Sequence, residues 1–240
     1  NNVALGYQAM KSNQTGGSNV AIGRQTLETN TTGIYNMGCG TYALNFNTTG
    51  EYNTGCGSFA LTANTTGSNN TACGNSALVT NTTGNRNTAI GEDSLYTNTT
   101  GDYNTSIGSD TLRANTTANY NCALGTQALL VNTTGAQNIS IGYNSLVANT
   151  TGTSNTAVGH YVASGNTTGG SNTSIGYWAG YTTTTGEYNL CLGTNAIASS
   201  ATVDDEVVLG DSHIATLRCN TQTISALSDA RDKVEVEPSP

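Results

Sequence analysis

Cysteine and histidine are the most reactive side chains of this chain, and they are few: its 240 residues hold six cysteines and two histidines. Cys39, Cys56 and Cys73 follow one another at intervals of 17 residues. Such a column could be a ladder of metal ligands or a disulfide staple, but structural zinc sites need four converging ligands, usually from close cysteine pairs. We therefore interpret the three as small apolar replacements for Ile or Leu in a core. This interpretation predicts slow alkylation of the native protein.

The other reactive residues do not form a recognisable catalytic pattern. Cys122, Cys191 and Cys219 fall at other positions of the 17-residue period, and His160 and His213 lack the Ser, Asp or Cys motifs of hydrolases. The Asp-rich repeats of calcium-binding rolls are replaced by Asn and Thr. We expect no enzymatic activity, no cofactor and no bound metal.

Aromatic residues at regular spacing are the candidates for ligand binding. Five tyrosines share the position twelve residues after a recurring glycine, and Tyr177 and Trp178 lie directly after such a glycine, as do Tyr7 and Tyr143. Exposed rings stack on sugars, and they also fill gaps between neighbouring units. Both interpretations stay open for this set: Tyr35, Tyr52, Tyr103, Tyr120, Tyr188, Tyr177 and Trp178.

The period that spaces these residues is a repeat of 17 residues. Glycine recurs at every seventeenth position from Gly6 to Gly210, and Asn stands four residues earlier in all units but the last, which has Glu206. The consensus is Asn-Thr-Ala-Ile-Gly, then Ala-Leu, then Asn-Thr-Thr-Gly. A period without exception indicates stacked units of equal size. We predict an all-β parallel β-solenoid, or β-roll, with stacked asparagine side chains along its axis.

Two apolar positions per unit are predicted to face the core from two short strands. One is the residue before the glycine, as in Leu5 and Ile22, where Cys39, Cys56 and Cys73 also stand; the other is Leu, four residues after the glycine. The corner is assigned to Asn-Thr-Thr-Gly, because Gly and Asn tolerate positive φ. Nine of these triplets are formal glycosylation sequons, which we interpret as structural corners.

The residue two before the glycine is Ala, Ser or Gly in eleven of thirteen units. Strand side chains alternate, so this column is predicted to face away from the core. Small residues suit tight packing against another backbone, and a 17-residue coil is too narrow to bury much alone. We expect a homotrimer; a tight internal corner is the alternative.

Charge and hydropathy exclude other classes of partner. Lys and Arg number seven, with no basic stripe for nucleic acid, and eight of the fifteen Asp and Glu lie in the last 37 residues. No apolar run is long enough for a membrane helix, so we expect no membrane insertion.

The Asn-Thr-Ala-Ile-Gly strand followed by Ala, over residues 2–210, resembles the head repeats of trimeric autotransporter adhesins, which form parallel β-rolls in homotrimers. The stretch from Leu209 through the sequence Ser228-Asp229-Ala230-Arg231-Asp232-Lys233 resembles the junction into the intramolecular-chaperone domain of endosialidase-type phage tail fibres. That resemblance implies a trimerising chaperone that cuts itself off before a serine matched by Ser228, which places the junction at Leu227, Ser228 and Asp229.

These features lead to an expected organisation of a β-solenoid shaft over residues 1–210, a trimeric neck over 211–227 and the start of a chaperone junction over 228–240. We expect a structural shaft of a phage tail fibre or spike, located in the virion, with other tail proteins and a host-surface glycan or protein as partners. The alternatives are a trimeric adhesin on a bacterial cell surface and an ice-binding solenoid.

Overall fold

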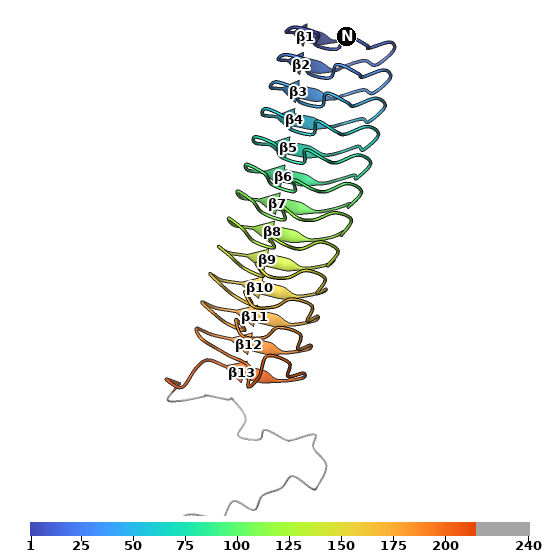
Figure 1. Ribbon diagram of the computed structural model, residues 1–240. Coiled ribbons are helices and arrows are strands. Elements are labelled where there is room, and N and C mark those ends of the chain that lie inside the picture. The colour runs from blue at the N-terminus through green and yellow to red at the C-terminus, as the bar shows by residue number, and fades with distance from the viewer. Residues whose placement is uncertain (215–240) are drawn as a thin grey trace, which may run out of the picture.

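The computed structural model describes residues 1–214, which form one long stack of similar turns (Figure 1). Each turn, here called a rung and numbered by its strand, contributes three residues to one sheet. The strands are β1 Val3–Leu5, β2 Val20–Ile22, β3 Met37–Cys39, β4 Thr54–Cys56, β5 Thr71–Cys73, β6 Thr88–Ile90, β7 Thr105–Ile107, β8 Cys122–Leu124, β9 Ile139–Ile141, β10 Thr156–Val158, β11 Thr173–Ile175, β12 Leu190–Leu192 and β13 Val207–Leu209.

The thirteen strands form a single parallel sheet in sequence order. Each residue pairs with the residue 17 positions later, as Val3 with Val20 and Leu5 with Ile22. The predicted parallel β-solenoid with a 17-residue repeat is therefore confirmed. Thirteen strands at the usual spacing of about 4.8 Å make a rod roughly 60 Å long.

A first asparagine ladder, formed by the Asn four residues before each recurring glycine from Asn2 to Asn189, runs through the interior. The side-chain Oδ1 of Asn19 accepts a hydrogen bond of 2.8 Å from the backbone N–H of Asn36 in the next rung. Its Nδ2 donates to the carbonyl of Gly33 at 2.8 Å. The same pair of bonds recurs along the column, for example at Asn87. The prediction of stacked asparagines is confirmed.

A second asparagine ladder begins at Asn13 and continues through the Asn of each Asn-Thr-Thr triplet. Each Nδ2 donates to the Oδ1 of the preceding rung, as Asn81 to Asn64 at 2.8 Å, and also to the carbonyl three residues later. The ladder ends at Asn166, whose Oδ1 has no partner because Thr183 takes the next position. The sequon asparagines from Asn30 to Asn166 are buried with both amide hydrogens engaged, which agrees with the structural interpretation of these triplets.

The interior lies between the sheet and a column of leucines. The leucines four residues after the recurring glycine are fully buried, as predicted. Opposite them lies the middle residue of each strand, such as Ala72, Ala89 and Ala123, all with 0% exposure. At Gly55 an added Cβ would already be 3.3 Å from Leu44. Small residues are therefore required because the coil is narrow. The predicted outward orientation of this column is wrong: the column is internal, although it lies within the strands and not at a corner.

The phase of the strands was predicted wrongly. The residue before the glycine points away from the interior: Leu5 is 67% exposed and Ile90 39%. Cys39 and Cys73 are exposed and Cys56 is half-buried, so their predicted core position is also wrong for a single chain. Because side chains on a strand alternate, a shift of one residue exchanges the two faces. The inner face holds the small residues, and the apolar column lies outside.

One strand per rung is present instead of the predicted two. The segment that carries the buried leucine is a turn in which non-glycine residues take positive φ, including Tyr42 at 61° and Leu44 at 52°. Backbone bonds to the next rung, such as Leu44 N–H to the carbonyl of Ala60 at 2.9 Å, hold this conformation. The recurring glycine has the positive φ expected of a turn glycine. Gly57, for example, has φ +138°, and a Cβ there would collide with the carbonyl of Gly74.

Interior volume is conserved where the consensus changes. In rung 11 the leucine position is occupied by Gly180, and in rung 12 the middle strand residue is Cys191, which is 1% exposed. A Cβ added to Gly180 would lie 3.8 Å from the Cβ of Cys191. The larger strand residue thus compensates for the missing leucine.

The predicted neck and junction lie mostly beyond this part of the chain. Residues 215–227 of the neck, and Leu227, Ser228 and Asp229 at the proposed cleavage junction, are outside the described residues. Within the described part of the neck, Ile214 is 49% exposed.

Replacement of a ladder asparagine tests the role of the stacked amides. Asn81→Ala removes the acceptor of Asn98 Nδ2 and the donor to Asn64 Oδ1. Because buried polar atoms lose their partners, we expect the free energy of unfolding to fall by about 2–3 kcal/mol, measured by urea denaturation. The control is Asn75→Ala, at an exposed asparagine of the same rung. Equal effects of the two substitutions would contradict the importance of the ladder.

Candidate functional site

The tyrosines predicted from one position of the repeat stack in pairs along the rod. Tyr35 and Tyr52 have ring centroids 5.0 Å apart with planes 11° from parallel, and Tyr103 and Tyr120 are 5.1 Å apart at 17°. Tyr188, at 61% exposure, has non-aromatic residues at the equivalent positions of both neighbouring rungs. The pairing follows from the fold, because equivalent residues of adjacent rungs are superposed.

A larger group of rings occupies rungs 9 to 11 and is here called the aromatic cluster. Its members are Tyr143, His160, Tyr161, Tyr177, Trp178 and Tyr181. His160 stacks between Tyr143 and Tyr177, at centroid distances of 5.0 and 5.9 Å. Tyr177 also stacks on Trp178 at 5.4 Å, and Tyr161 meets Trp178 edge to face at 6.3 Å.

Sequence reasoning identified Tyr143, Tyr177 and Trp178 but missed His160, Tyr161 and Tyr181. His160 and Tyr177 share one position of the repeat, and Tyr161 and Trp178 share the next. Aligning all residues by the 17-residue period would have found His160 and Tyr161. Tyr181 lies at a different position of the repeat and joins the cluster only through the turn. The structure thus brings the predicted Tyr177 and Trp178 together and leaves the tyrosine pairs elsewhere on the rod.

The surroundings of the aromatic cluster determine which ligands suit it. Residues 114–186, which include the whole cluster, contain no Asp, Glu, Lys or Arg. Tyr177 is 48% exposed and Trp178 38%, so parts of both rings meet solvent. Exposed rings with phenol and indole hydrogen-bonding groups, in the absence of charge, suit a neutral polyhydroxylated ligand such as a sugar.

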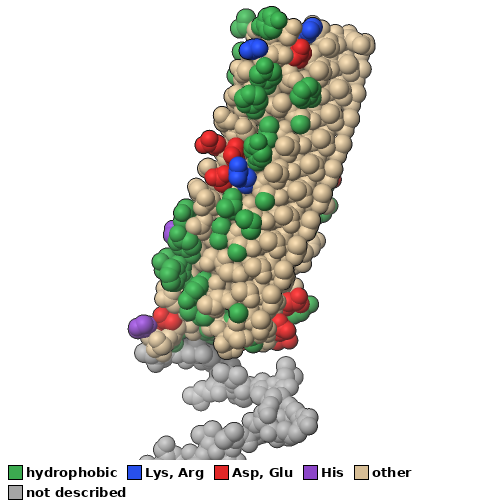
Figure 2. All heavy atoms as spheres, viewed as in Figure 1, with side chains coloured by type: hydrophobic (Ala, Val, Ile, Leu, Met, Phe, Trp, Pro, Cys, Tyr) green, Lys and Arg blue, Asp and Glu red, His purple; other side chains and the backbone are tan. Residues whose placement is uncertain are grey.

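Charges lie in small groups on an otherwise neutral surface, and hydrophobic side chains form separate patches along it (Figure 2). Arg113 forms ion pairs with Asp93 at 3.4 Å and Asp110 at 3.3 Å, and its guanidinium lies over the ring of Tyr96. Beside it is a shallow hollow of about 300 Å³. Its lining residues are Tyr96, Thr97, Arg113, Ala114, Leu130 and Val131.

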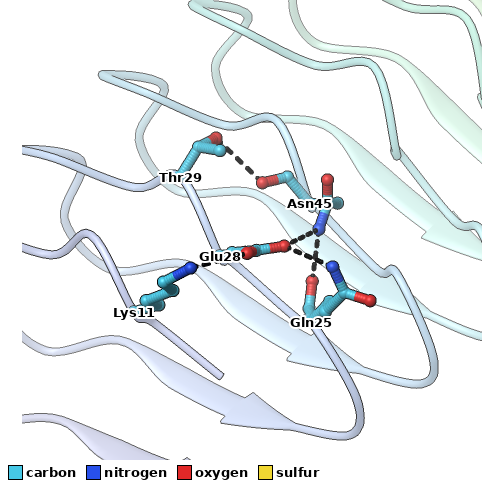
Figure 3. Close-up of polar contacts among 5 residues, drawn as sticks. All are labelled: Lys11, Gln25, Glu28, Thr29 and Asn45. Atoms are coloured by element: carbon cyan, nitrogen blue, oxygen red, sulfur yellow. Dashed lines mark hydrogen bonds and ion pairs between the residues drawn. The ribbon is translucent and has the colours of Figure 1, made fainter. Parts of the chain in front are cut away.

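Glu28 is the centre of a polar network on rungs 1 to 3 (Figure 3). Its Oε2 accepts hydrogen bonds from Gln25 Nε2 at 2.7 Å and from Asn45 Nδ2 at 3.2 Å, and Lys11 Nζ lies 3.9 Å from Oε1. The hydrogen bond from Gln25 is the main cause that lowers the pKa of Glu28 below its ordinary value, against a smaller opposing effect of burial. Because the carboxylate has partners within the protein, we interpret it as structural.

The cysteine column lies on the outside of the sheet. Cys39, Cys56 and Cys73 are in register on β3, β4 and β5 and form no disulfide. Burial, and secondarily the two neighbouring thiols, raise the pKa of Cys56, so its thiol is less nucleophilic at neutral pH. Within residues 1–214, no group of three or more Cys, His, Asp or Glu is placed to hold a metal ion.

The paired threonines of each corner differ in environment. The first, such as Thr48, donates its hydroxyl hydrogen to the carbonyl of Thr65 in the next rung at 3.0 Å. The second, such as Thr49, is exposed. The corner therefore presents one free column of threonine side chains to solvent.

The pKa of Glu28 provides a test of the polar network. We expect carboxyl NMR to give a midpoint below the usual glutamate value, raised more by Gln25→Ala than by Lys11→Ala. A folded-state pKa that is depressed means that ionised Glu28 stabilises the protein above its unfolded-state pKa. This contribution is lost as the pH falls through the folded-state value. A larger effect of Lys11→Ala would contradict the assigned order of causes.

Within residues 1–214 the structure contains no helix long and apolar enough to cross a membrane. Comparison with known protein families and with curated proteins found no family model and no protein that matches this chain.

Proposed function

We propose that this chain is a structural shaft of a phage tail fibre or spike, and that three copies associate about a common axis. The observation that carries this proposal is the rod itself, in which thirteen rungs in uniform register are joined by continuous asparagine ladders. A rod of this kind has the rigidity needed to hold a tip at a fixed distance. The resemblance around Ser228 to a chaperone junction favours a virion tail fibre, assembled with other tail proteins.

The proposed shaft also contacts the host surface through the aromatic cluster. The support is the exposure of Tyr177 and Trp178 in a segment without charge, which suits neutral sugars of a host-surface glycan. One such site per chain is repeated three times in a trimer, so that weak single contacts combine into stable attachment. The tyrosine pairs Tyr35–Tyr52 and Tyr103–Tyr120 and the isolated Tyr188 are additional contact points in this proposal.

The related candidate is an adhesin on a bacterial cell surface, because the resemblance to autotransporter head repeats concerns the same strand motif. Antibodies raised against residues 1–214 distinguish the two locations. Labelling of fibres on purified phage particles supports the proposed shaft. Labelling of uninfected cells, with none on particles, would favour the adhesin.

The assembly is tested by the mass of the purified chain in solution. Three chains of 24.6 kDa give about 74 kDa, and stacked repeats give an elongated particle. We expect light scattering coupled to size exclusion to report this mass, with elution earlier than a globular protein of equal mass. A stable, folded particle of 24.6 kDa would overturn the trimeric shaft.

Glycan contact is tested on an array of neutral and acidic oligosaccharides. We expect retention by neutral sugars, reduced about tenfold by the double substitution Tyr177→Ala and Trp178→Ala, because two stacking surfaces are lost. The control is Phe46→Ala, at an aromatic residue that is 52% exposed outside the cluster. Retention unaffected by the double substitution, or restricted to acidic sugars, would refute this site.

A further inference from the structure

One face of the long sheet is apolar and uncovered in the single chain. We call it the sheet outer face and define it by the first and third residues of the thirteen strands. No charged residue occurs in either column. Mid-rod examples are Ile90 at 39% exposure, Leu124 at 44%, Ile139 at 42% and Ile175 at 42%. The third residue of the strand is apolar in every rung from Leu5 to Leu209, so this column of the face runs along the whole stack.

An uncovered apolar face is unusual for a parallel sheet. Sheets in which all strands are parallel are generally covered on both faces. Here the inner face is covered by the leucine column, whereas nothing within residues 1–214 covers the outer face. Contiguous exposed apolar surface of this extent is typical of an interaction site.

The dimensions of the sheet outer face indicate the occupant. Thirteen strands at about 4.8 Å and three residues at about 3.3 Å give an area of roughly 60 by 10 Å. This flat area of about 600 Å² is of the same order as the ~800 Å² per partner of a standard stable interface. A partner that covers it must be equally long, flat and uncharged. A second copy of this chain, lying parallel with the same rise per rung, meets all three requirements.

The two columns of the face differ in composition. The third residue of the strand is apolar in all thirteen rungs, whereas the first is Thr in six of them, including Thr54 and Thr105. A fully buried position excludes hydroxyl groups without partners, and the edge of an interface accepts them. The third-residue column therefore belongs nearest the centre of the interface and the first-residue column nearer its edge.

We propose that parallel copies of this chain associate through the sheet outer face, with the third-residue column nearest their common axis. This inference rests on the trimeric shaft proposed above and names the surface that forms it. Cyclic symmetry lets each copy bury the same face against the others. Cys39, Cys56 and Cys73 of each chain then face the equivalent thiols of the neighbouring copies. The burial that sequence reasoning expected for this column is supplied by the partner chains.

The proposal is tested first by adding charge to the face. The double variant Ile90→Lys and Leu124→Lys places two charges in the third-residue column of each chain. We expect its mass to fall from about 74 kDa to 24.6 kDa, with the β-sheet circular dichroism retained. The matched control, Phe46→Lys and Val131→Lys, alters residues 52% and 37% exposed away from this face and should remain trimeric.

Cross-linking provides a second test that does not require disruption of the assembly. In a variant that retains only Cys56, with Ala at the other cysteines, a short bismaleimide should join chains covalently in the native protein. A variant that retains only Cys122, in the first-residue column, should cross-link much less. This comparison stays informative even where the lysine variant fails to fold.

The outcomes separate this inference from the proposed function. If the wild type is a trimer, the lysine variant also stays trimeric and Cys56 does not cross-link, the trimeric shaft stands and the assigned face is wrong. A wild-type monomer overturns both. Trimer dissociation by the face variant alone, together with preferential cross-linking at Cys56, supports the sheet outer face as the interface.

Discussion

The rest of the rod depends on asparagine amides that find their partners in the next rung. A carboxamide has two donor hydrogens and an acceptor oxygen, and leaving one unpaired inside a protein costs about 1–3 kcal/mol. In both ladders the partner is the equivalent residue 17 positions away, as with Asn64 and Asn81. The amides therefore favour one register and oppose slippage by any other number of residues. Where a ladder stops, as at Asn166, an acceptor remains unpaired.

A fixed register also fixes how much each rung can bury. The space between the sheet and the leucine column accepts Ala, Ser or Gly, and the exchange at Gly180 and Cys191 shows that total volume is limiting. A single coil therefore uses one large apolar residue per rung for its own core. The apolar residues on the other side of the strand are left exposed within residues 1–214, and the proposed association would bury them.

The sequence predicted the period, the parallel sheet, the ladders and the leucine column, because each depends on spacing alone. It did not predict which face of the strand was inside. Alternation defines two faces but not their identities, and an apolar column such as Ile90 and Ile107 has the same composition whether its cover is the chain's own core or a partner. The left-handed conformation of Leu44 has no local signal either, since only the neighbouring rungs impose it.

The recognition proposed for this chain uses positions that folding leaves free. Asparagine, glycine, leucine and the small strand residue are each fixed by a contact with the adjacent rung, so their substitution would disturb the stack. The two positions after the glycine face outward and hold Thr41 and Tyr42 in one rung, Ser58 and Phe59 in the next, and Tyr177 and Trp178 further along. The residues at these two positions differ between rungs, and the fold does not change. Aromatic residues can therefore be concentrated in a few neighbouring rungs without any change in the other rungs. The rings of the aromatic cluster can therefore vary without altering the rod, because the contacts that hold the rungs together involve different side chains.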